Sequence, residues 1–413
     1  MPKQWRLLFL LVFCTPPAFA QQSAFNNDSQ VYQPQIKTVQ AYNTQKEQSL
    51  PVIALHAKEQ LLFTFDDLEG GSKNYAYVVE HCTSDWKPSG LSTLDYVTSF
   101  AGDRLQDYEY ASGTLQNYTH YRLQLPNEQV QFKLSGNYLL KVYEDGKQKV
   151  PVISQRFYVV DNLVGLTIDV TPAPDVKQRN THQKVNFSIA TNRLRIQNPN
   201  TDLKTVVMQN GNPLTASYNS KPSFIKPDLI QYNDLKTNLF QAGNEFRKLD
   251  LRNLRAAQNK VQDRSRNEQK YTTQFDENGN FYIRNLEGRL AETESDYVKV
   301  DVQFDAPGPL EPGDIYIIGR FNNYILNDQS KLEYSTSLKA YQANLFLKQG
   351  LYDYQYVFKN RQTGQIDQTL LEGNYFETAN AYQVFVYYRK PGGRWDELVG
   401  YLSTQTDTLP PKQ

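Results

Sequence analysis

Short apolar segments separated by turn-forming residues are the feature that most limits what this chain can fold into. The segments 53–65, 75–80, 138–143 and 156–160 are rich in β-branched and aromatic residues and are bounded by Gly, Asn, Asp and Pro clusters. Such residues fit the pleated surface of a sheet, and such clusters are typical of strand ends. The one candidate helix, residues 251–270, carries six basic side chains and few large apolar ones, so we expect an exposed excursion between strands. The pattern predicts an all-β protein.

The first 20 residues have the three parts of an export signal. Lys3 and Arg6 give a positive start, residues 7–14 are an apolar run too short to span a bilayer, and residues 18–20 read Ala-Phe-Ala, a small-x-small cleavage site. We therefore expect an exported protein that is cleaved after Ala20. No later segment reaches the roughly 18 consecutive apolar residues of a membrane helix, so we expect no insertion into the membrane.

Charge and cysteine content exclude several classes of protein. Without residues 1–20, which include Lys3 and Arg6, 42 basic side chains face 44 acidic ones, and the net charge is about −2. This near balance gives no field that would attract nucleic acid or an anionic membrane. Cys82 is the single cysteine of the mature chain, so no intramolecular disulfide can form and apolar cores must supply the stability.

Turn and proline clusters divide the mature chain into expected domains. We expect residues 21–162 to form an immunoglobulin-like β-sandwich, in which Trp86 follows the strand at 75–80. A second sandwich is expected at 163–305, because it opens with the strand-like VGLTIDV and two prolines then mark a strand boundary. The fold class predicted is therefore all-β, with tandem immunoglobulin-like and early-set β-sandwich domains.

A third domain is expected at 306–400, followed by a polar tail at 401–413. It opens with the Pro-Gly-rich link APGPLEPGD, residues 306–314. Its order of segments resembles the early-set sandwich of glycogen- and starch-binding modules, in which two tryptophans stack on sugar rings and a lysine adds hydrogen bonds. Here Tyr324 stands at the first tryptophan position and Gln355 at the lysine position. The resemblance thus implies the fold, and it supports the sugar site poorly because ring stacking needs exposed aromatic faces.

His81 and Cys82 are donor types that metal sites and nucleophilic sites use, and Asp85 lies close by. Neighbouring side chains of a strand point to opposite faces, however, so His81 and Cys82 would not converge. The remaining histidines show no HxxxH pattern and no CxxC motif is present. We therefore expect no metal or catalytic site, and we place Cys82 and Trp86 in the core of the first sandwich.

Two charged stretches invite similar comparisons. The acidic cluster at 66–69 precedes two glycines but lacks the alternating oxygen ligands of a calcium loop, so we expect a solvated hairpin turn. In GNEFRKLD, Glu245 and Arg247 are two residues apart and share one face of a strand, while Phe246 faces the other. This spacing favours a cross-strand or interdomain salt bridge, with contact to a partner as the alternative.

The sequence contains none of the side-chain sets that an enzyme needs. No GxSxG, HExxH or paired-carboxylate arrangement is present, so we expect neither an enzyme nor a cofactor. The chain has 29 tyrosines and 21 phenylalanines, and aromatic residues dominate the energetics of many protein interfaces. The residues alone therefore indicate a binding protein.

Three separate segments, residues 81–146, 243–254 (GNEFRKLDLRNL) and 387–401 (YYRKPGGRWDELVGY), resemble the type IX secretion system plug protein family. The resemblance implies a non-enzymatic periplasmic protein that sterically closes the periplasmic opening of the secretion translocon. It also implies a partner, the large outer-membrane β-barrel translocon, and we expect a monomer when the protein is free. The alternative is a periplasmic carbohydrate-binding protein that uses the third domain.

The surface that contacts the partner is expected where basic or aromatic side chains are exposed. Two stretches meet this description, the basic excursion and the aromatic turn GRFNNY. Their candidate residues are Arg252, Arg255, Arg264, Arg266, Arg320, Phe321 and Tyr324.

Overall fold

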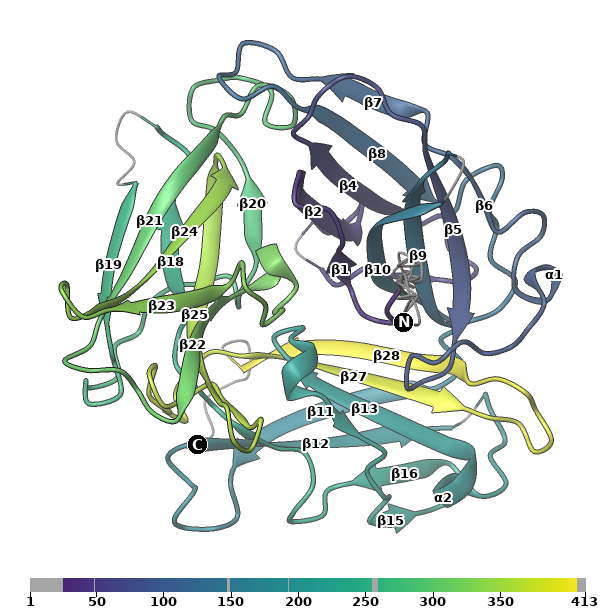
Figure 1. Ribbon diagram of the computed structural model, residues 1–413. Helices are drawn as coiled ribbons and strands as arrows, with labels where there is room; N and C mark the ends of the chain where they lie inside the picture. Colours follow the sequence, from purple (N-terminus) through teal and green to yellow (C-terminus); the bar gives the residue numbers. More distant parts are fainter. Residues whose placement is uncertain (1–24, 48, 147–148, 192, 255–258, 407–413) are drawn as a thin grey trace, which may run out of the picture.

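The computed structural model of the chain describes residues 25–47, 49–146, 149–191, 193–254 and 259–406. The expected signal peptide, its cleavage site, Arg255 and residues 407–413 of the expected tail lie outside this part. Strands dominate the regular structure, and the α-helices α1 and α2 have four residues each. The prediction of an all-β protein is confirmed. The strands form three units around a common centre (Figure 1).

The first unit packs a six-stranded sheet, with β1-β10-β9-β5-β6 in order and β3 on β10, against the four-stranded sheet β2-β4-β8-β7. Aromatic side chains such as Phe63, Tyr121, Tyr138 and Phe157 fill the space between the two sheets. The elements are β1 Gln30–Val31, β2 Ile36–Asn43, β3 Val52–Ala54, β4 Leu61–Asp67, β5 Tyr75–Cys82, α1 Thr93–Tyr96, β6 Gly102–Arg104, β7 Asp107–Tyr110, β8 Thr119–Leu125, β9 Gly136–Glu144 and β10 Val150–Val160.

The second unit packs the sheet β11-β12-β16-β15, with β17 on β12, against the sheet β14-β13-β27-β28. Its core includes Phe187, Tyr232, Val207 and Val384. The elements are β11 Gly165–Pro172, β12 His182–Ala190, α2 Pro199–Asp202, β13 Leu203–Gln209, the 3-10 helix η1 Pro213–Thr215, β14 Ser217–Tyr218, β15 Phe224–Ile225, β16 Leu229–Tyr232, β17 Leu239–Gln241, β27 Ala381–Tyr388 and β28 Glu397–Gln405.

The third unit is a nine-stranded sheet in the order β18-β25-β22-β23-β24-β21-β19, with β20 and β26 also on β25. One apolar core, which includes Leu249, Phe304, Ile315 and Tyr356, takes side chains from strands along the whole of this order. The elements are β18 Arg247–Asp250, β19 Lys260–Arg264, β20 Phe281–Ile283, β21 Tyr297–Asp305, β22 Gly313–Ile318, the 3-10 helix η2 Arg320–Asn322, β23 Lys331–Ser335, β24 Ala340–Lys348, β25 Gly350–Asn360 and β26 Ile366–Asp367.

The connectivity of the units differs from the linear division that the sequence suggested. The link 306–314 joins β21 to β22 inside one sheet, so it does not separate two folds. The segment 381–389, expected in the third domain, contains β27, which pairs with β13 of the second unit over seven residues. Residues 401–405, expected in a polar tail, belong to β28 and pair with β27. In Figure 1 these last two strands lie beside the strands of the second unit.

Two smaller expectations about strands were also wrong. The segment 53–65 is interrupted by a turn, because β3 ends at Ala54 and β4 begins at Leu61. Within the basic stretch 251–270, residues Lys260–Arg264 form β19, which pairs in parallel with β21.

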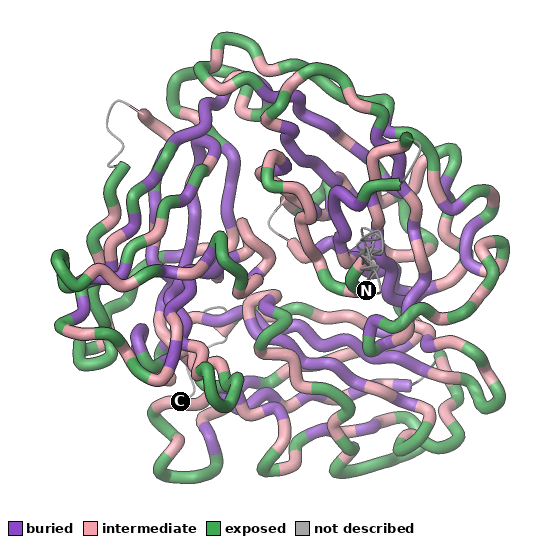
Figure 2. Tube along the Cα trace, in the orientation of Figure 1, coloured by how far each residue is buried: buried purple, intermediate pink, exposed green. Residues whose placement is uncertain are grey.

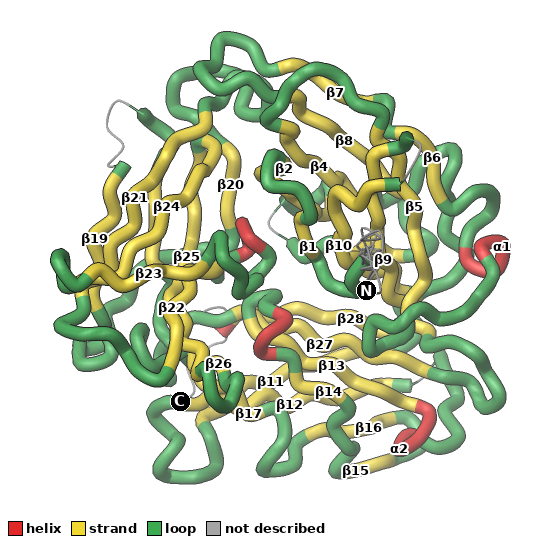
Figure 3. Tube along the Cα trace, in the orientation of Figure 1, coloured by secondary structure: helices red, strands yellow, loops and turns green. Residues whose placement is uncertain are grey.

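The buried residues follow the strands toward the centre of each unit (Figure 2), whereas loops form most of the periphery (Figure 3).

Candidate functional site

The turn that follows β22 lies where the three units meet, and it was expected to be exposed. The Arg320 guanidinium donates to the backbone oxygens of Ala41, at 3.1 Å, and Ser49, at 2.6 Å, both in the first unit. The Tyr324 hydroxyl donates to the backbone oxygen of Asn210 in the second unit at 3.2 Å. Tyr324 is only 3% exposed, so the expectation of an exposed turn is wrong for this residue. The turn joins the three units to each other.

The basic residues of the excursion occupy different surroundings. Arg264 is exposed at the end of β19, whereas Arg252 is half-buried and makes an ion pair with Asp250 at 2.6 Å. The Arg266 side chain, in contrast, is largely buried. The described residues of the stretch therefore do not form one continuous exposed basic surface.

The salt bridge predicted for the GNEFRKLD segment is confirmed at Arg247, whereas Glu245 lies before β18 and accepts hydrogen bonds from the Tyr271 hydroxyl and the Ala379 backbone N–H. The Arg247 Nε lies 3.0 Å from both carboxylate oxygens of Glu372, and its Nη1 lies 3.0 Å from Asp263 Oδ1. Arg266 Nε adds a further contact of 2.9 Å to Glu372. Glu372 is 1% exposed, so two guanidinium groups neutralise a carboxylate that would be costly to bury alone. The network holds the chain that leads from the third unit back to β27.

A buried pair of carboxyl groups, Asp276 and Asp353, lies beside the turn at residues 319–324, which we call the central turn. No sequence motif pointed to this pair. Asp353 accepts the backbone N–H groups of Glu277, at 2.5 Å, and Gly279, at 3.2 Å. Asp276 accepts the backbone N–H of Phe246. Burial raises the pKa of Asp276 to about 8, and the nearby Asp353 carboxylate adds to this effect. The pair shapes the turn that contains Gly279, and the Gly279 backbone oxygen accepts the backbone N–H of Arg320 in the central turn at 2.9 Å.

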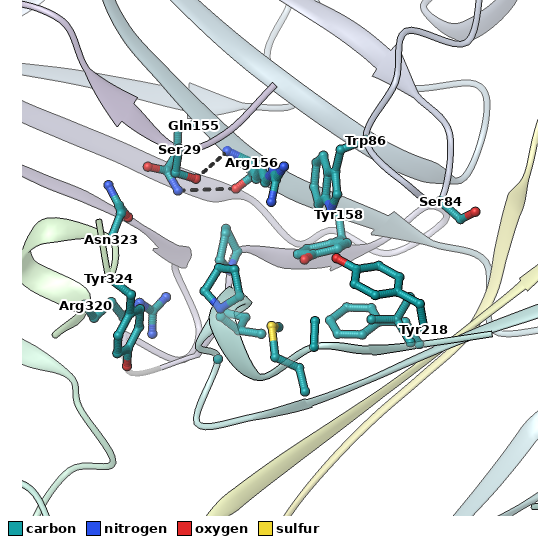
Figure 4. Close-up of a pocket in the computed structure, with 18 of the residues that line it drawn as sticks. Ser29, Ser84, Trp86, Gln155, Arg156, Tyr158, Tyr218, Arg320, Asn323 and Tyr324 are labelled. Carbon is teal, nitrogen blue, oxygen red and sulfur yellow. Dashed lines mark hydrogen bonds between the residues drawn. The ribbon is translucent and has the colours of Figure 1, made fainter. Parts of the chain in front are cut away.

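Two cavities lie at the centre, and neither contains a catalytic set of side chains. The smaller, about 70 Å³ in volume, is lined by Trp86, Arg156, Tyr218 and Tyr324 among others (Figure 4). This volume is far below the roughly 300–1,000 Å³ of small-molecule sites. The larger, about 650 Å³, is lined by amide, hydroxyl, charged and apolar side chains from all three units. Phe321, one of the candidate residues, is half-buried and lines a third hollow. Its ring meets the Tyr352 ring edge-on, with 5.9 Å between the ring centres.

Trp86 and Cys82 are buried as predicted, but in a different place. They belong to an apolar cluster shared by the first and second units, which also contains Tyr158 and Phe385. The Trp86 ring contacts Tyr158 edge-on at 5.2 Å, and Tyr158 stacks on Phe385 at 4.5 Å. His81 faces the other side of β5, where its ring meets Tyr138 of the first core at 5.0 Å. The opposite orientation of His81 and Cys82 is therefore confirmed.

A buried carboxylate reinforces the same junction. Asp396 Oδ2 accepts both the backbone N–H of Ser84, at 3.0 Å, and its hydroxyl, at 2.9 Å. Lys204 Nζ lies 3.1 Å from the same oxygen, and Arg389 Nε lies 2.8 Å from the other. Burial acts to raise the pKa of Asp396, but the hydrogen bonds from Ser84 and Arg389 outweigh it, and the pKa lies below its usual value.

Two of the three acidic residues expected in a solvated turn, Asp66 and Asp67, are buried at the end of β4, whereas Glu69 is exposed in the turn that follows. Asp66 on β4 is 0% exposed and accepts hydrogen bonds from His120 Nδ1 at 2.6 Å, Tyr297 Oη at 2.7 Å and Lys348 Nζ at 2.7 Å. The ammonium of Lys348 also lies 4.2 Å from the centre of the Tyr118 ring. The expectation of a solvated turn holds for Glu69 and was wrong for Asp66, whose partners lie up to 282 residues away in sequence.

Electrostatics explain how Asp66 stays ionised without water. Burial acts to raise its pKa, but the charge of Lys348 and the hydrogen bond from His120 act more strongly together, so its pKa lies below the ordinary value. The cluster is an ionic lock between β4 and β8 of the first unit and β21 and β24 of the third. We call the residues Asp66, His120, Tyr297 and Lys348 the ionic lock.

The structure provides two further findings about possible sites. Among the described residues, no group of three or more His, Cys, Asp or Glu side chains is placed to hold a metal ion. No helix in the described ranges is both long and apolar enough to cross a membrane.

Comparisons with known proteins identify relatives of the whole chain and of its first unit. A crystal structure of a hypothetical protein from Parabacteroides merdae is 34% identical, covers 92% of this chain and 99% of its own, and superposes with a TM-score of 0.88. A structure of collagen adhesin from S. aureus is 10% identical with a TM-score of 0.12, which is too low to indicate a common fold. A search of curated protein sequences gave no match.

The family comparison concerns the unit that carries Asp66 and Trp86. The model named type 9 secretion system plug protein 1st domain matches residues 36–161, which run from β2 to the end of β10. The resemblance noted in residues 81–146 is thus confirmed, whereas the segments 243–254 and 387–401 lie outside the matched range. Residues 36–161 of this chain therefore belong to the type 9 secretion system plug protein family as its first domain.

Proposed function

We propose that this protein is a non-enzymatic periplasmic plug that sterically closes the periplasmic opening of the type IX secretion translocon. The observation that carries the proposal is the match of residues 36–161 to the first domain of the plug family. The export signal expected at 1–20 agrees with a periplasmic location. The partner is the large outer-membrane β-barrel of the same secretion system, and the chain acts through protein contacts.

Occlusion requires a body that keeps its shape, and the junctions between the units support this requirement. The ionic lock ties the first unit to the third, the cluster around Trp86 ties the first to the second, and the central turn contacts both. Buried, well-packed contacts of this kind resist relative motion of the units. Release of the pore then requires a translocon state that binds the plug less tightly, because only differential affinity shifts such an equilibrium.

Glycan binding by the third unit loses its main support in the structure. Tyr324, at the position where related modules stack a sugar ring, is almost fully buried, and its hydroxyl is engaged with Asn210. Gln355, at the lysine position, donates to the side chain of Gln368 at 3.0 Å. Neither residue offers an exposed face to a sugar.

Affinity purification of the tagged protein from native outer membranes tests the proposal. We expect the β-barrel translocon to be recovered with it, identified by mass spectrometry as the prominent partner. An unrelated periplasmic protein with the same tag serves as the control and is expected to recover none. Recovery of this protein alone, or bound to peptidoglycan or polysaccharide, would contradict the proposed function.

A further inference from the structure

Large apolar side chains are exposed where loops of the first and third units meet. Residues 111–117, between β7 and β8, and residues 285–296, between β20 and β21, together form what we call the apical surface, at the top of Figure 1. Leu115 is 95% exposed, Leu290 66% and Leu286 62%. Single exposed leucines are common on proteins, but several on adjoining loops are typical of an interaction site.

Hydrogen bonds fix the two loops of the apical surface to each other. The backbone N–H of Ser112 donates to the Thr293 oxygen at 2.9 Å, and that of Leu115 donates to Asp296 Oδ1 at 2.5 Å. Arg289 Nη1 reaches the Gly113 oxygen at 3.3 Å. The leucines are therefore carried on a paired structure that spans two units, and Figure 2 shows the loops as mainly exposed tubes at this edge.

The ionic lock supports the apical surface from below. Lys348 Nζ, which pairs with Asp66, also donates to the backbone oxygen of Glu292 at 2.5 Å. The Tyr118 hydroxyl donates to the backbone oxygen of Ser295 at 3.0 Å. The loop is thus ordered before any partner arrives, and a preordered surface loses less conformational entropy on binding.

The charges around the leucines indicate what kind of partner fits. The apical surface, residues 111–117 and 285–296, contains four acidic side chains and one basic side chain, which gives a formal charge of −3. Three of the acidic residues, Glu287, Glu292 and Glu294, are exposed or half-buried and form the acidic rim, whereas Asp296 is buried. An acidic rim repels the anionic headgroups of a membrane surface and favours a basic protein surface.

We propose that the apical surface is the docking site of this protein on its translocon. Leu115, Leu286 and Leu290 enter an apolar patch on the periplasmic face of the partner, and basic side chains of the partner surround that patch and face the acidic rim. This inference rests on the proposed function, because it assigns the surface through which the plug is held. It also differs from the sequence-based expectation, which placed the partner-binding surface at the basic stretch and the central turn.

Binding of purified variants to the detergent-solubilised translocon tests the inference. The double variant Leu115→Ser/Leu290→Ser is expected to bind at least about tenfold more weakly than wild type, because central apolar contacts carry most interface energy. The matched control is Leu235→Ser/Leu338→Ser, since both leucines are exposed, at 70% and 53%, on loops outside the apical surface. We expect the control to bind like wild type and both double variants to melt like wild type.

The charge of the rim is tested separately. Glu287→Lys, in an exposed loop position, is expected to weaken binding several-fold, and added salt should weaken the wild-type complex. If wild type binds the translocon and the apical variant binds equally well, the docking surface is wrong while the proposed function stands. If wild type does not bind, the proposed function fails together with the inference. Leucine-dependent binding of wild type to phosphatidylglycerol vesicles would overturn the assignment of a protein partner.

Discussion

Replacing Lys348 with alanine is expected to lower the free energy of unfolding by about 3–5 kcal/mol, the cost typical of breaking a buried ion pair. The Lys348 side chain is 1% exposed, and its ammonium lies 2.7 Å from Asp66 Oδ2. Its removal leaves a buried carboxylate without its cation, and it removes the donor to the Glu292 oxygen. Urea denaturation followed by fluorescence measures the effect, and the loop 285–296 should become more sensitive to protease.

Lys299→Ala is the matched control for this change. Lys299 lies on β21, in the same sheet as Lys348, but its side chain is 66% exposed and 3.7 Å from Asp301. Exposed pairs contribute about 0–1 kcal/mol, so the control should unfold almost like wild type. Equal stability of the two variants would show that the ionic lock does not hold the first and third units together.

Trp86→Ala is expected to cost about 3–5 kcal/mol, as typical of a large aromatic side chain removed from a core. Trp86 is 5% exposed, packs on Tyr158, and carries the Arg156 guanidinium 4.4 Å from its ring centre. Because the surrounding cluster belongs to two units, the variant should lower the melting temperature and expose the 161–164 connection to protease. Thermal denaturation and limited proteolysis measure both effects.

Two variants bracket the Trp86 result. Cys82→Ser, in the same cluster, is expected to cost about 1–3 kcal/mol because a hydroxyl is buried in an apolar pocket. Phe100→Ala removes an aromatic ring that is 73% exposed, and it should melt like wild type. Wild-type melting of Trp86→Ala, or loss of stoichiometric zinc from Cys82→Ser without loss of stability, would contradict the structural role of this cluster.

Local patterns in the sequence predicted strands such as β5, β9 and β11, because each of these carries its own run of β-branched and aromatic residues. The assignment of strands to units failed at β27, whose eight residues are all buried. One face of β27 packs in the second core through Tyr382 and Val384, and the other packs at the junction through Phe385 and Tyr387. A strand covered on both faces carries no alternation that would reveal its partners.

The same limit applies to the candidate sites. A salt bridge at Arg247 could be predicted because a charged side chain stands there in a strand-like segment, but its partners Glu372 and Asp263 could not be named. Asp66 looked like a turn residue, since its short acidic stretch precedes two glycines. Its burial depends on Lys348, which only the packing of two units brings near. The central turn also looked exposed, because the residues that contact it, such as Ala41, Ser49 and Asn210, belong to the other two units.

Ion conductance of the purified translocon in a planar bilayer tests the central claim most directly, because occlusion is a claim about flow through the pore. Conductance is recorded before and after the protein is added on the periplasmic side, and the Leu115→Ser/Leu290→Ser variant is run at the same concentrations. We predict that the wild-type protein, at saturating concentration, lowers the conductance to near the level of a bilayer that contains no translocon. An open-pore conductance that stays unchanged with the wild-type protein bound would contradict the account.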